Sequence, residues 1–255
     1  MKIITANVNG IRAAEKKGFF NWLAAADADV VCLQEIKAQE EQLSVQFYPS
    51  GYYVYYHPAQ KKGYSGTAIF ARQKPNQVSK QTDWRDMDEE GRFIQADFGD
   101  LSVISLYLPS GSAKQERQDF KMAFLTERFM PYLQKIRQDG RNYIICGDWN
   151  IAHKKIDLKN WRSNQKNSGF LPAERAWMDA LFGTVGFVGA FRVLNPDEGQ
   201  YTWWSNRGQA WANNTGWRID YQVISPSLRR AVKAVFIYKT ERFSDHAPLI
   251  IDYVL

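Results

Sequence analysis

The sequence predicts an α/β fold in which two mixed β-sheets pack face to face and helices cover their outer sides. Short β-rich runs recur along the chain and outnumber the segments with helical periodicity. Many of these runs follow one another through short turns, which argues against a regular βαβ repeat. Several runs are almost entirely apolar, as expected of strands that are covered on both faces.

The predicted strands are runs of β-branched, aromatic and other apolar residues. Some alternate, as in the segment 92–98, which is typical of a half-buried strand. In chain order the strands are Lys2–Asn7, Val30–Gln34, Tyr52–His57, Thr67–Ala71, Phe93–Phe98, Leu101–Leu108, Tyr143–Cys146, Ile219–Ser225, Val232–Tyr238 and Pro248–Val254.

Helical spacing of apolar residues predicts the helices. Gly18–Ala26 places aromatic residues and a leucine on one side, and Gln115–Gln138 does the same over a longer stretch with a kink expected at Pro131. Pro172–Phe182 begins with a proline and a glutamate, which suit a first helical turn.

Composition narrows the class of protein. The 255 residues include 9 Trp, 13 Tyr and 15 Phe, and disordered chains are poor in aromatic residues. No Pro/Ser linker or low-complexity tract divides the sequence, so we expect one domain over residues 1–255. No apolar run approaches the roughly 18 residues of a membrane span, and Met1 leads directly into a strand without a secretory leader.

Cysteine usage and charge suggest a compartment and a partner. Cys32 and Cys146 lie inside apolar runs and are expected to be buried thiols, so we predict an intracellular protein, cytoplasmic if bacterial. The formal net charge is +6. Cations concentrate between His153 and Asn167, where Asp157 is the single acid; this loop either contacts a polyanion or is a solvated surface.

Acids, amides and a histidine follow several apolar strands directly. The segments are 5–10, 31–35, 145–150, 217–221 and 244–248. A carboxylate in such a place is costly to bury unless it meets a cation or hydrogen-bond donors. The oxygen ligands among these residues suit Mg²⁺ or Mn²⁺ better than zinc; they are Asn7, Glu35, Asp148, Asn150 and Asp245.

Each of these segments also has a purely structural interpretation. Glu35 could pair with Lys37 or a distant arginine, and the residues after Gly147 could form a turn. Asp245 and the following histidine could be a surface pair. Spacing alone does not bring the segments together in space.

The chain resembles the exonuclease III-type abasic-site (AP) endonucleases of the endonuclease/exonuclease/phosphatase superfamily. The resemblance extends from Ile3 nearly to the C-terminus. The segments that carry it are Asn7-Val8-Asn9-Gly10-Ile11-Arg12, Leu33-Gln34-Glu35-Ile36-Lys37, Gly63-Tyr64-Ser65-Gly66-Thr67-Ala68, Tyr107-Leu108-Pro109, Gly147-Asp148-Trp149-Asn150-Ile151-Ala152-His153, Trp217-Arg218-Ile219-Asp220-Tyr221 and Ser244-Asp245-His246-Ala247-Pro248.

The resemblance implies a four-layered α/β sandwich and a set of site roles. Glu35 resembles the principal Mg²⁺ ligand, and the metal group as a whole comprises Asn7, Glu35, Asp148, Asn150, Asp245 and His246. Asp148 resembles the group that orients and deprotonates the attacking water. His246, supported by Asp220, resembles a charged donor to the scissile phosphate. The catalytic group comprises Tyr107, Asp148, Asn150, Asp220 and His246.

Substrate contacts are implied in the same way. Trp203, Trp217 and Ile219 match segments that wall an abasic-sugar pocket, although these tryptophans could instead be ordinary packing. DNA contacts are implied for Arg12, Lys37, Lys154, Lys155, Asn164, Asn167 and Arg207. Three positions depart from the family pattern, namely Asn9, Ser110 and Arg207.

The leading hypothesis is a Mg²⁺-dependent DNA-repair hydrolase that acts in base excision repair. It would cleave the phosphodiester 5′ to an abasic site in double-stranded DNA, with Mn²⁺ as a substitute metal, and act as a monomer without a membrane partner. The departures leave the share of 3′–5′ exonuclease and 3′-phosphatase activity open. The alternatives are a superfamily relative that works mainly as a 3′-end-processing or non-specific nuclease, and a non-catalytic DNA-binding module.

Overall fold

The computed structural model describes residues Met1–Leu255 and contains two six-stranded mixed sheets. In the first sheet the strand order is β13-β14-β1-β2-β4-β3, with bounds Val232–Ile237, Leu249–Tyr253, Lys2–Asn7, Val30–Gln34, Thr67–Ala71 and Tyr53–His57. In the second it is β5-β6-β7-β8-β12-β9, with bounds Gln77–Ser79, Phe93–Phe98, Leu101–Tyr107, Asn142–Asp148, Asp220–Ile224 and Val188–Gly189. The strands β10 (Trp203–Trp204) and β11 (Gly216–Trp217) form a separate short hairpin.

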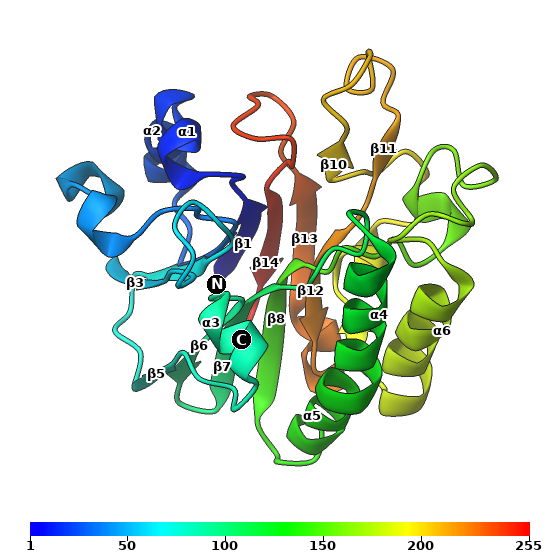
Figure 1. Cartoon of the computed structure of the whole chain (residues 1–255). Helices are drawn as coiled ribbons and strands as arrows, with labels where there is room; N and C mark the ends of the chain where they lie inside the picture. The colour runs from blue at the N-terminus through cyan, green and yellow to red at the C-terminus, as the bar shows by residue number, and fades with distance from the viewer.

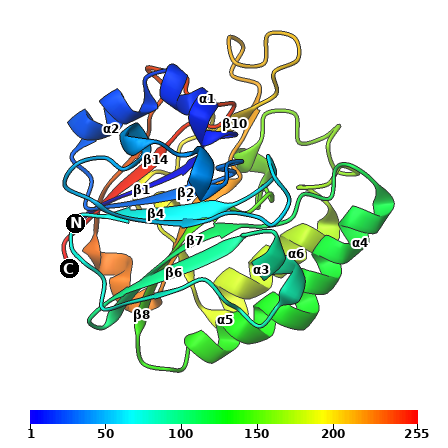
Figure 2. The ribbon, with the colours of Figure 1, turned by 60° about the vertical axis from the view of Figure 1, so that its left-hand side comes forward.

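The molecule has four layers, which Figure 2 shows almost edge-on. Helices α1 (Ile11–Lys16) and α2 (Phe19–Ala26) cover the first sheet, and α4 (Gln115–Ala123), α5 (Met130–Ile136) and α6 (Pro172–Ala180) cover the second (Figure 1). Apolar side chains from both sheets, including Ile3, Ile69 and Val103, form one buried core between them. The two cysteines are free and lie in this core.

The predicted fold is confirmed, and most predicted strands lie within a residue or two of those observed. The short strands β5, β9, β10 and β11 were not predicted, nor were the short helices α1, α3 (Arg85–Glu89) and α7 (Phe191–Leu194). The long helix predicted over 115–138 consists of α4, a π-helical segment Phe124–Phe129, and α5. The irregularity thus precedes Pro131, which has no N–H to donate to the preceding turn. None of the helices is both long and apolar enough to span a membrane.

Strand directions bring the polar strand ends to one edge of the two sheets. Strands β1 and β2 are parallel, so Asn7 and Gln34 pair at their carboxyl ends. In the second sheet β8 runs parallel to β7 and antiparallel to β12, and the register places Asp148 beside both Tyr107 and Asp220. The loops at this edge therefore receive side chains from both sheets.

Candidate active site

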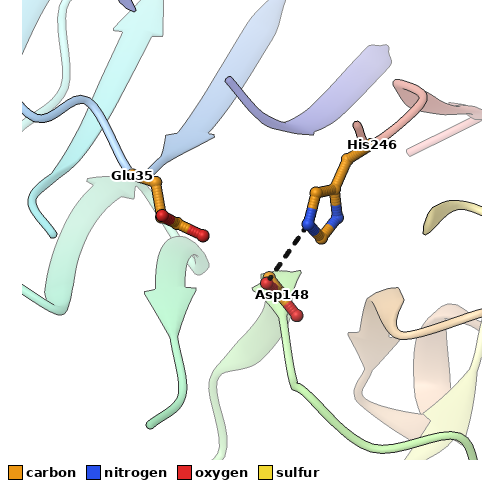
Figure 3. Close-up of side chains that lie close together, drawn as sticks. All are labelled: Glu35, Asp148 and His246. Carbon is orange, nitrogen blue, oxygen red and sulfur yellow. Dashed lines mark ion pairs between the residues drawn. The ribbon is translucent and has the colours of Figure 1, made fainter. Parts of the chain in front are cut away.

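Glu35, Asp148 and His246 meet at this edge although they are far apart in the sequence. One ligand atom from each lies within 4.8 Å of the others. Figure 3 shows the three side chains converging from separate elements, with Asp148 and His246 joined by an ion pair of 3.8 Å between Oδ2 and Nε2. Asp148 and His246 are buried, and Glu35 is partly buried.

Asn7 bridges the two carboxylates. Its Nδ2 donates to Glu35 Oε1 at 2.8 Å and to Asp148 Oδ2 at 2.9 Å. The orientation of the amide is fixed because its Oδ1 accepts from the backbone N–H of Asn9 at 3.0 Å. Asn7 therefore presents a donor to this cluster and holds two like charges in place.

His246 is held by a second carboxylate behind it. Its Nδ1 lies 2.9 Å from Asp220 Oδ2, and both side chains are buried. Burial alone would lower the pKa of His246, but Asp220, followed by Asp148 and Asp245, raises this pKa to about 10. The imidazole is thus a cation at neutral pH, with Nε2 directed toward Asp148.

The Asp148 carboxyl is the most perturbed acid of the cluster. Burial raises its pKa to about 7, with Asp220 and Glu35 adding to the rise and His246 opposing it. Oδ1 accepts from the backbone N–H of Asn150 at 2.9 Å, and the Asn150 side chain donates to Leu108 O at 2.9 Å. The backbone N–H of Asn150 thus fixes the orientation of this carboxyl, which suits a group that exchanges a proton.

A chain of polar contacts continues around Glu35. Lys37 Nζ lies 2.8 Å from Glu35 Oε2 and also donates to Asn9 Oδ1. Asn9 Nδ2 donates to Asp245 Oδ1 at 2.9 Å, and Trp203 Nε1 donates to Asp245 Oδ2 at 3.1 Å. Although burial opposes it, the pKa of Glu35 is lowered by Lys37, Asn7 and His246, so this carboxylate stays ionised.

The backbone around the cluster adopts the left-handed region at non-glycine residues. The φ angle is 51° at Glu35 and 52° at Asn150, and it is also positive at Asn9, Lys37 and Ser65. This conformation costs free energy, about 1–3 kcal/mol for each such residue, and persists only where surrounding contacts over-determine it. Residues away from the cavity, such as Asp27 and Asp83, share this conformation, so it supports the assignment of the site only together with the contacts above.

One cavity of about 280 Å³ joins the cluster to an aromatic wall. The predicted pocket residues Trp203, Trp217 and Ile219 line it together with the three clustered side chains. The two tryptophan rings stand edge to face with centroids 6.3 Å apart, because their strands β10 and β11 pair at these positions. Further lining residues are Tyr107, Ser110, Ser112, Asn150, Asn167, Ser168, Gly169 and Asp245.

The residues expected to contact DNA occupy several places. Arg12 and Lys37 line a second cavity, of about 470 Å³, with Lys16 and no acid. In the basic loop, Lys154 pairs with Asp179 at the surface, and Lys155 Nζ lies 4.3 Å from the centroid of the Trp161 ring.

Of the remaining residues expected to contact DNA, Asn167 lies at the cavity and Arg207 lies in a projecting loop. Asn167 lines the cavity and donates to Asn164 at 2.7 Å. Arg207 is exposed in the loop between β10 and β11, which projects from the body of the molecule (Figure 1).

Arg92, which holds the side chain and backbone of Tyr107 in place, was not identified from the sequence. Arg92 is buried with its guanidinium 4.4 Å from the centroid of the Tyr107 ring, and it donates to Tyr107 O at 3.1 Å. Burial and the nearby Glu35 raise the pKa of Tyr107 well above its ordinary value, so its hydroxyl is a neutral donor. Arg92 begins the alternating segment 92–98, and nothing in this pattern predicts its contact with Tyr107.

Comparison with known proteins identifies the family of the chain. The model of the Endonuclease/Exonuclease/phosphatase family matches residues 4–246. An exodeoxyribonuclease of Bacillus subtilis (strain 168) is 43% identical over 251 residues, which cover 98% of each chain. An AP endonuclease structure from Archaeoglobus fulgidus superposes with a TM-score of 0.89 at 29% identity, and covers 100% of both chains.

A second solved structure bears DNA. A 3′ phosphatase from Neisseria, described as bound to a product DNA hairpin, superposes with a TM-score of 0.91 at 25% identity and covers 100% of both chains. These likenesses confirm the resemblance drawn from the motifs. The chain belongs to the endonuclease/exonuclease/phosphatase family, within which it is a DNA-repair nuclease of the AP endonuclease/exonuclease III type.

Proposed function

We propose that this nuclease hydrolyses the phosphodiester on the 5′ side of an abasic site in duplex DNA. The observation that carries the proposal is the shared cavity, in which Glu35, Asp148 and His246 face an apolar wall of Trp203, Trp217 and Ile219. The side chains that would perform the hydrolysis and the apolar wall that would select the sugar thus face the same bound nucleotide. Both sheets supply this cavity, which supports one catalytic domain over residues 1–255. We further propose, from the sequence alone, that it acts as a monomer inside the cell.

The donor set fits a divalent magnesium ion. Carboxylate oxygens of Glu35 and Asp148 face each other, and Asp245 lines the same cavity, whereas no cysteine approaches it. Hard oxygen donors of this kind favour Mg²⁺, or Mn²⁺ in its place, over zinc. When bound, such an ion would supply positive charge to the phosphate oxygens and lower the pKa of neighbouring acids.

The remaining polar groups divide between holding carboxylates and acting on the phosphate. Asn7 donates to Glu35 and Asp148, and so orients the metal-binding carboxylates. The Asp220-held cation of His246 would donate to a phosphate oxygen as negative charge develops there. Asp148, oriented by the N–H of Asn150, would accept the proton of the attacking water. Tyr107 lines the cavity with a neutral hydroxyl that would donate to the phosphate or the leaving oxygen.

The apolar wall accounts for selection of a sugar without a base. A flipped abasic sugar would pack against Trp203, Trp217 and Ile219, while an attached base would collide with them. Lys37, Arg12, Lys154, Lys155, Asn164, Asn167 and Arg207 would grip the phosphates without reading sequence. Asn164 and Asn167 support the loop that borders this wall.

Replacing Trp217 with alanine should therefore weaken selectivity more than chemistry. We expect cleavage of the abasic duplex to fall by about tenfold in kcat/KM, with cleavage of intact duplex unchanged or increased, because half of the aromatic wall is lost. Steady-state kinetics on the two duplexes measures the ratio. Trp22→Ala, which alters a tryptophan packed on Phe243 in the first helical layer, is the matched control. An unchanged ratio for Trp217→Ala would mean that the wall does not select the substrate.

We also propose 3′-end processing, by 3′-phosphatase or 3′–5′ exonuclease action, as a second activity of the same cavity. Ser110 and Ser112 line the cavity with short hydroxyl side chains, which could donate to a terminal phosphate. The Neisseria relative that is described as a 3′ phosphatase supports this activity.

A single assay separates these activities. An end-labelled duplex with one abasic site and a parallel duplex with a 3′-phosphate are incubated with Mg²⁺ and with EDTA. We expect a discrete incision product with Mg²⁺, slower shortening or dephosphorylation of the 3′ end, and no product with EDTA. Equal cleavage of abasic and intact strands would support a non-specific nuclease instead, and retention of both substrates with tight binding would support a non-catalytic module.

A further inference from the structure

A buried ion pair lies behind the wall of the cavity, outside the cluster that performs the chemistry. Lys121 of α4 and Glu174 of α6 are both 0% exposed, with Lys121 Nζ 2.6 Å from Glu174 Oε1. Gln118 Nε2 also donates to this oxygen at 3.2 Å. Two charges and an amide are thus withdrawn from water between the helices, which is costly. The cost is not fully offset, because Gln118 Oε1 has no hydrogen-bond partner.

The remaining bonds of the pair go to the backbone of the cavity wall. Lys121 Nζ donates to Asn150 O at 2.8 Å. Glu174 Oε2 accepts from the backbone N–H of Gly169 at 2.7 Å and of Leu171 at 3.0 Å. Asn150 and Gly169 both line the cavity, so the pair ties two separate wall segments to the helical layer.

These two segments touch each other and leave little freedom for movement. A Cβ added at Gly169 would lie 3.1 Å from Asn150 O and 3.3 Å from the Trp217 ring. Gly169 O accepts from Ala152 N at 2.7 Å. Asn150 has the strained left-handed backbone, and its N–H orients Asp148. A shift of either segment would therefore move both the reacting carboxylate and the aromatic wall.

Part of the role of Glu174 is local, because its bond from the Leu171 N–H caps the start of α6. This capping does not require a buried lysine partner or a bond to Asn150. Replacing a buried ion pair with well-packed apolar residues is often neutral or stabilising, whereas removing one partner leaves a costly unpaired charge. We propose that Lys121 and Glu174 are positioning residues, which hold Asn150 and Gly169 so that Asp148 and Trp217 meet the substrate in register. This inference rests on the proposed function of the cavity and adds to it the residues that set its shape.

The double variant Lys121→Met, Glu174→Met tests the proposal because it removes both charges together and retains apolar bulk. On the abasic duplex we expect kcat to fall by about tenfold to a hundredfold, since misplacement of about 1 Å can cost a hundredfold. KM should change by less than about twofold, because the pair bonds to none of the basic side chains proposed to grip DNA. The single variant Lys121→Arg keeps a charged donor to Glu174, so its kcat should be higher than that of the double variant.

Leu133→Ala is the control for a merely structural effect. Leu133 is buried in α5 of the same helical layer and does not line the cavity. This variant should melt at a lower temperature yet retain wild-type kcat where it is folded. A folded double variant with wild-type kcat would overturn the proposal.

Two further measurements keep the outcome decisive. If the double variant does not fold, Glu174→Asp replaces it; this variant keeps the charge and shortens the reach to Gly169, and it must show the same fall in kcat at constant KM. The wild-type chain is assayed in parallel on abasic and 3′-phosphate duplexes. If the wild-type chain does not cleave the abasic duplex, the proposed function is rejected. The ratio of kcat between variant and wild type on the 3′-phosphate duplex would still test the role of the ion pair.

Discussion

Replacing Glu35 with alanine should reduce Mg²⁺-dependent incision of an abasic duplex by on the order of 10³-fold, or about 4 kcal/mol in transition-state stabilisation. Glu35 supplies an ionised carboxylate whose pKa is lowered by Lys37 and Asn7, and it faces Asp148 across the cluster. Its loss would leave Asn7 Nδ2 and Lys37 Nζ without one acceptor each. Single-turnover incision at several Mg²⁺ concentrations measures the effect.

DNA affinity should stay close to that of the wild type, because the basic surface is unchanged and a local negative charge is removed. Fluorescence anisotropy with a labelled abasic duplex in EDTA measures this affinity. Glu40→Ala is the matched control, since Glu40 is an exposed carboxylate distant from the cavity-lining residues and paired only weakly with Lys80 at 3.8 Å. Undiminished incision by Glu35→Ala would show that this carboxylate does not serve the reaction.

The second large effect is expected for His246→Ala, with a loss of about 10²- to 10³-fold in kcat. The imidazolium is the cation of the cluster, held by Asp220 at 2.9 Å and facing Asp148 at 3.8 Å. Without it, the cluster loses a charged hydrogen-bond donor to the negative charge that develops on the phosphate, which leaves Lys37 and a bound metal ion to oppose that charge. His153→Ala, in which a half-buried surface histidine paired with Asp179 is removed, should retain activity.

The pH profile gives an independent check on the same histidine. Asp220 raises the pKa of His246 to about 10, so the cation persists well above neutral pH. Asp220→Asn keeps an acceptor for Nδ1 but removes the charge, and it should lower this pKa toward the ordinary value. The alkaline limb of the activity profile should therefore move to lower pH. An unmoved limb would mean that protonation of His246 does not control the rate.

The parts of the fold that could be predicted are those in which burial dominates. Runs such as Val30–Gln34 are covered on both faces, so they are apolar throughout and can be recognised without tertiary information. Two-residue strands such as β10 and β11 carry no periodicity and form because their tryptophans pair across the hairpin. The π-helical segment Phe124–Phe129 likewise reflects packing between layers, and the apolar spacing of an ordinary helix does not distinguish it.

The site was predictable only in part for a similar reason. Glu35 and Asp148 could be recognised because a carboxylate at the end of an apolar strand is costly to bury. Their convergence was indicated by the family resemblance, since sequence spacing alone could not show it. The sequence does not give the direction of an amide, so the donor role of Asn7 depended on its bond from Asn9. Nor does it give partners distant in sequence, such as Arg92 for Tyr107 or Lys121 for Asn150.

The cluster straddles the seam between the two sheets, with Glu35 following β2 of the first sheet and Asp148 ending β8 of the second. Turnover therefore reports on whether the halves of the sandwich are docked. Mild denaturant, which loosens the packing between the sheets, should abolish catalysis before most of the hydrogen-bonded strands are lost, because a small shift between the sheets already separates Glu35 from Asp148. We therefore expect enzymatic activity to be lost at a lower denaturant concentration than the far-ultraviolet circular dichroism signal. Activity would then measure how closely the two sheets are packed.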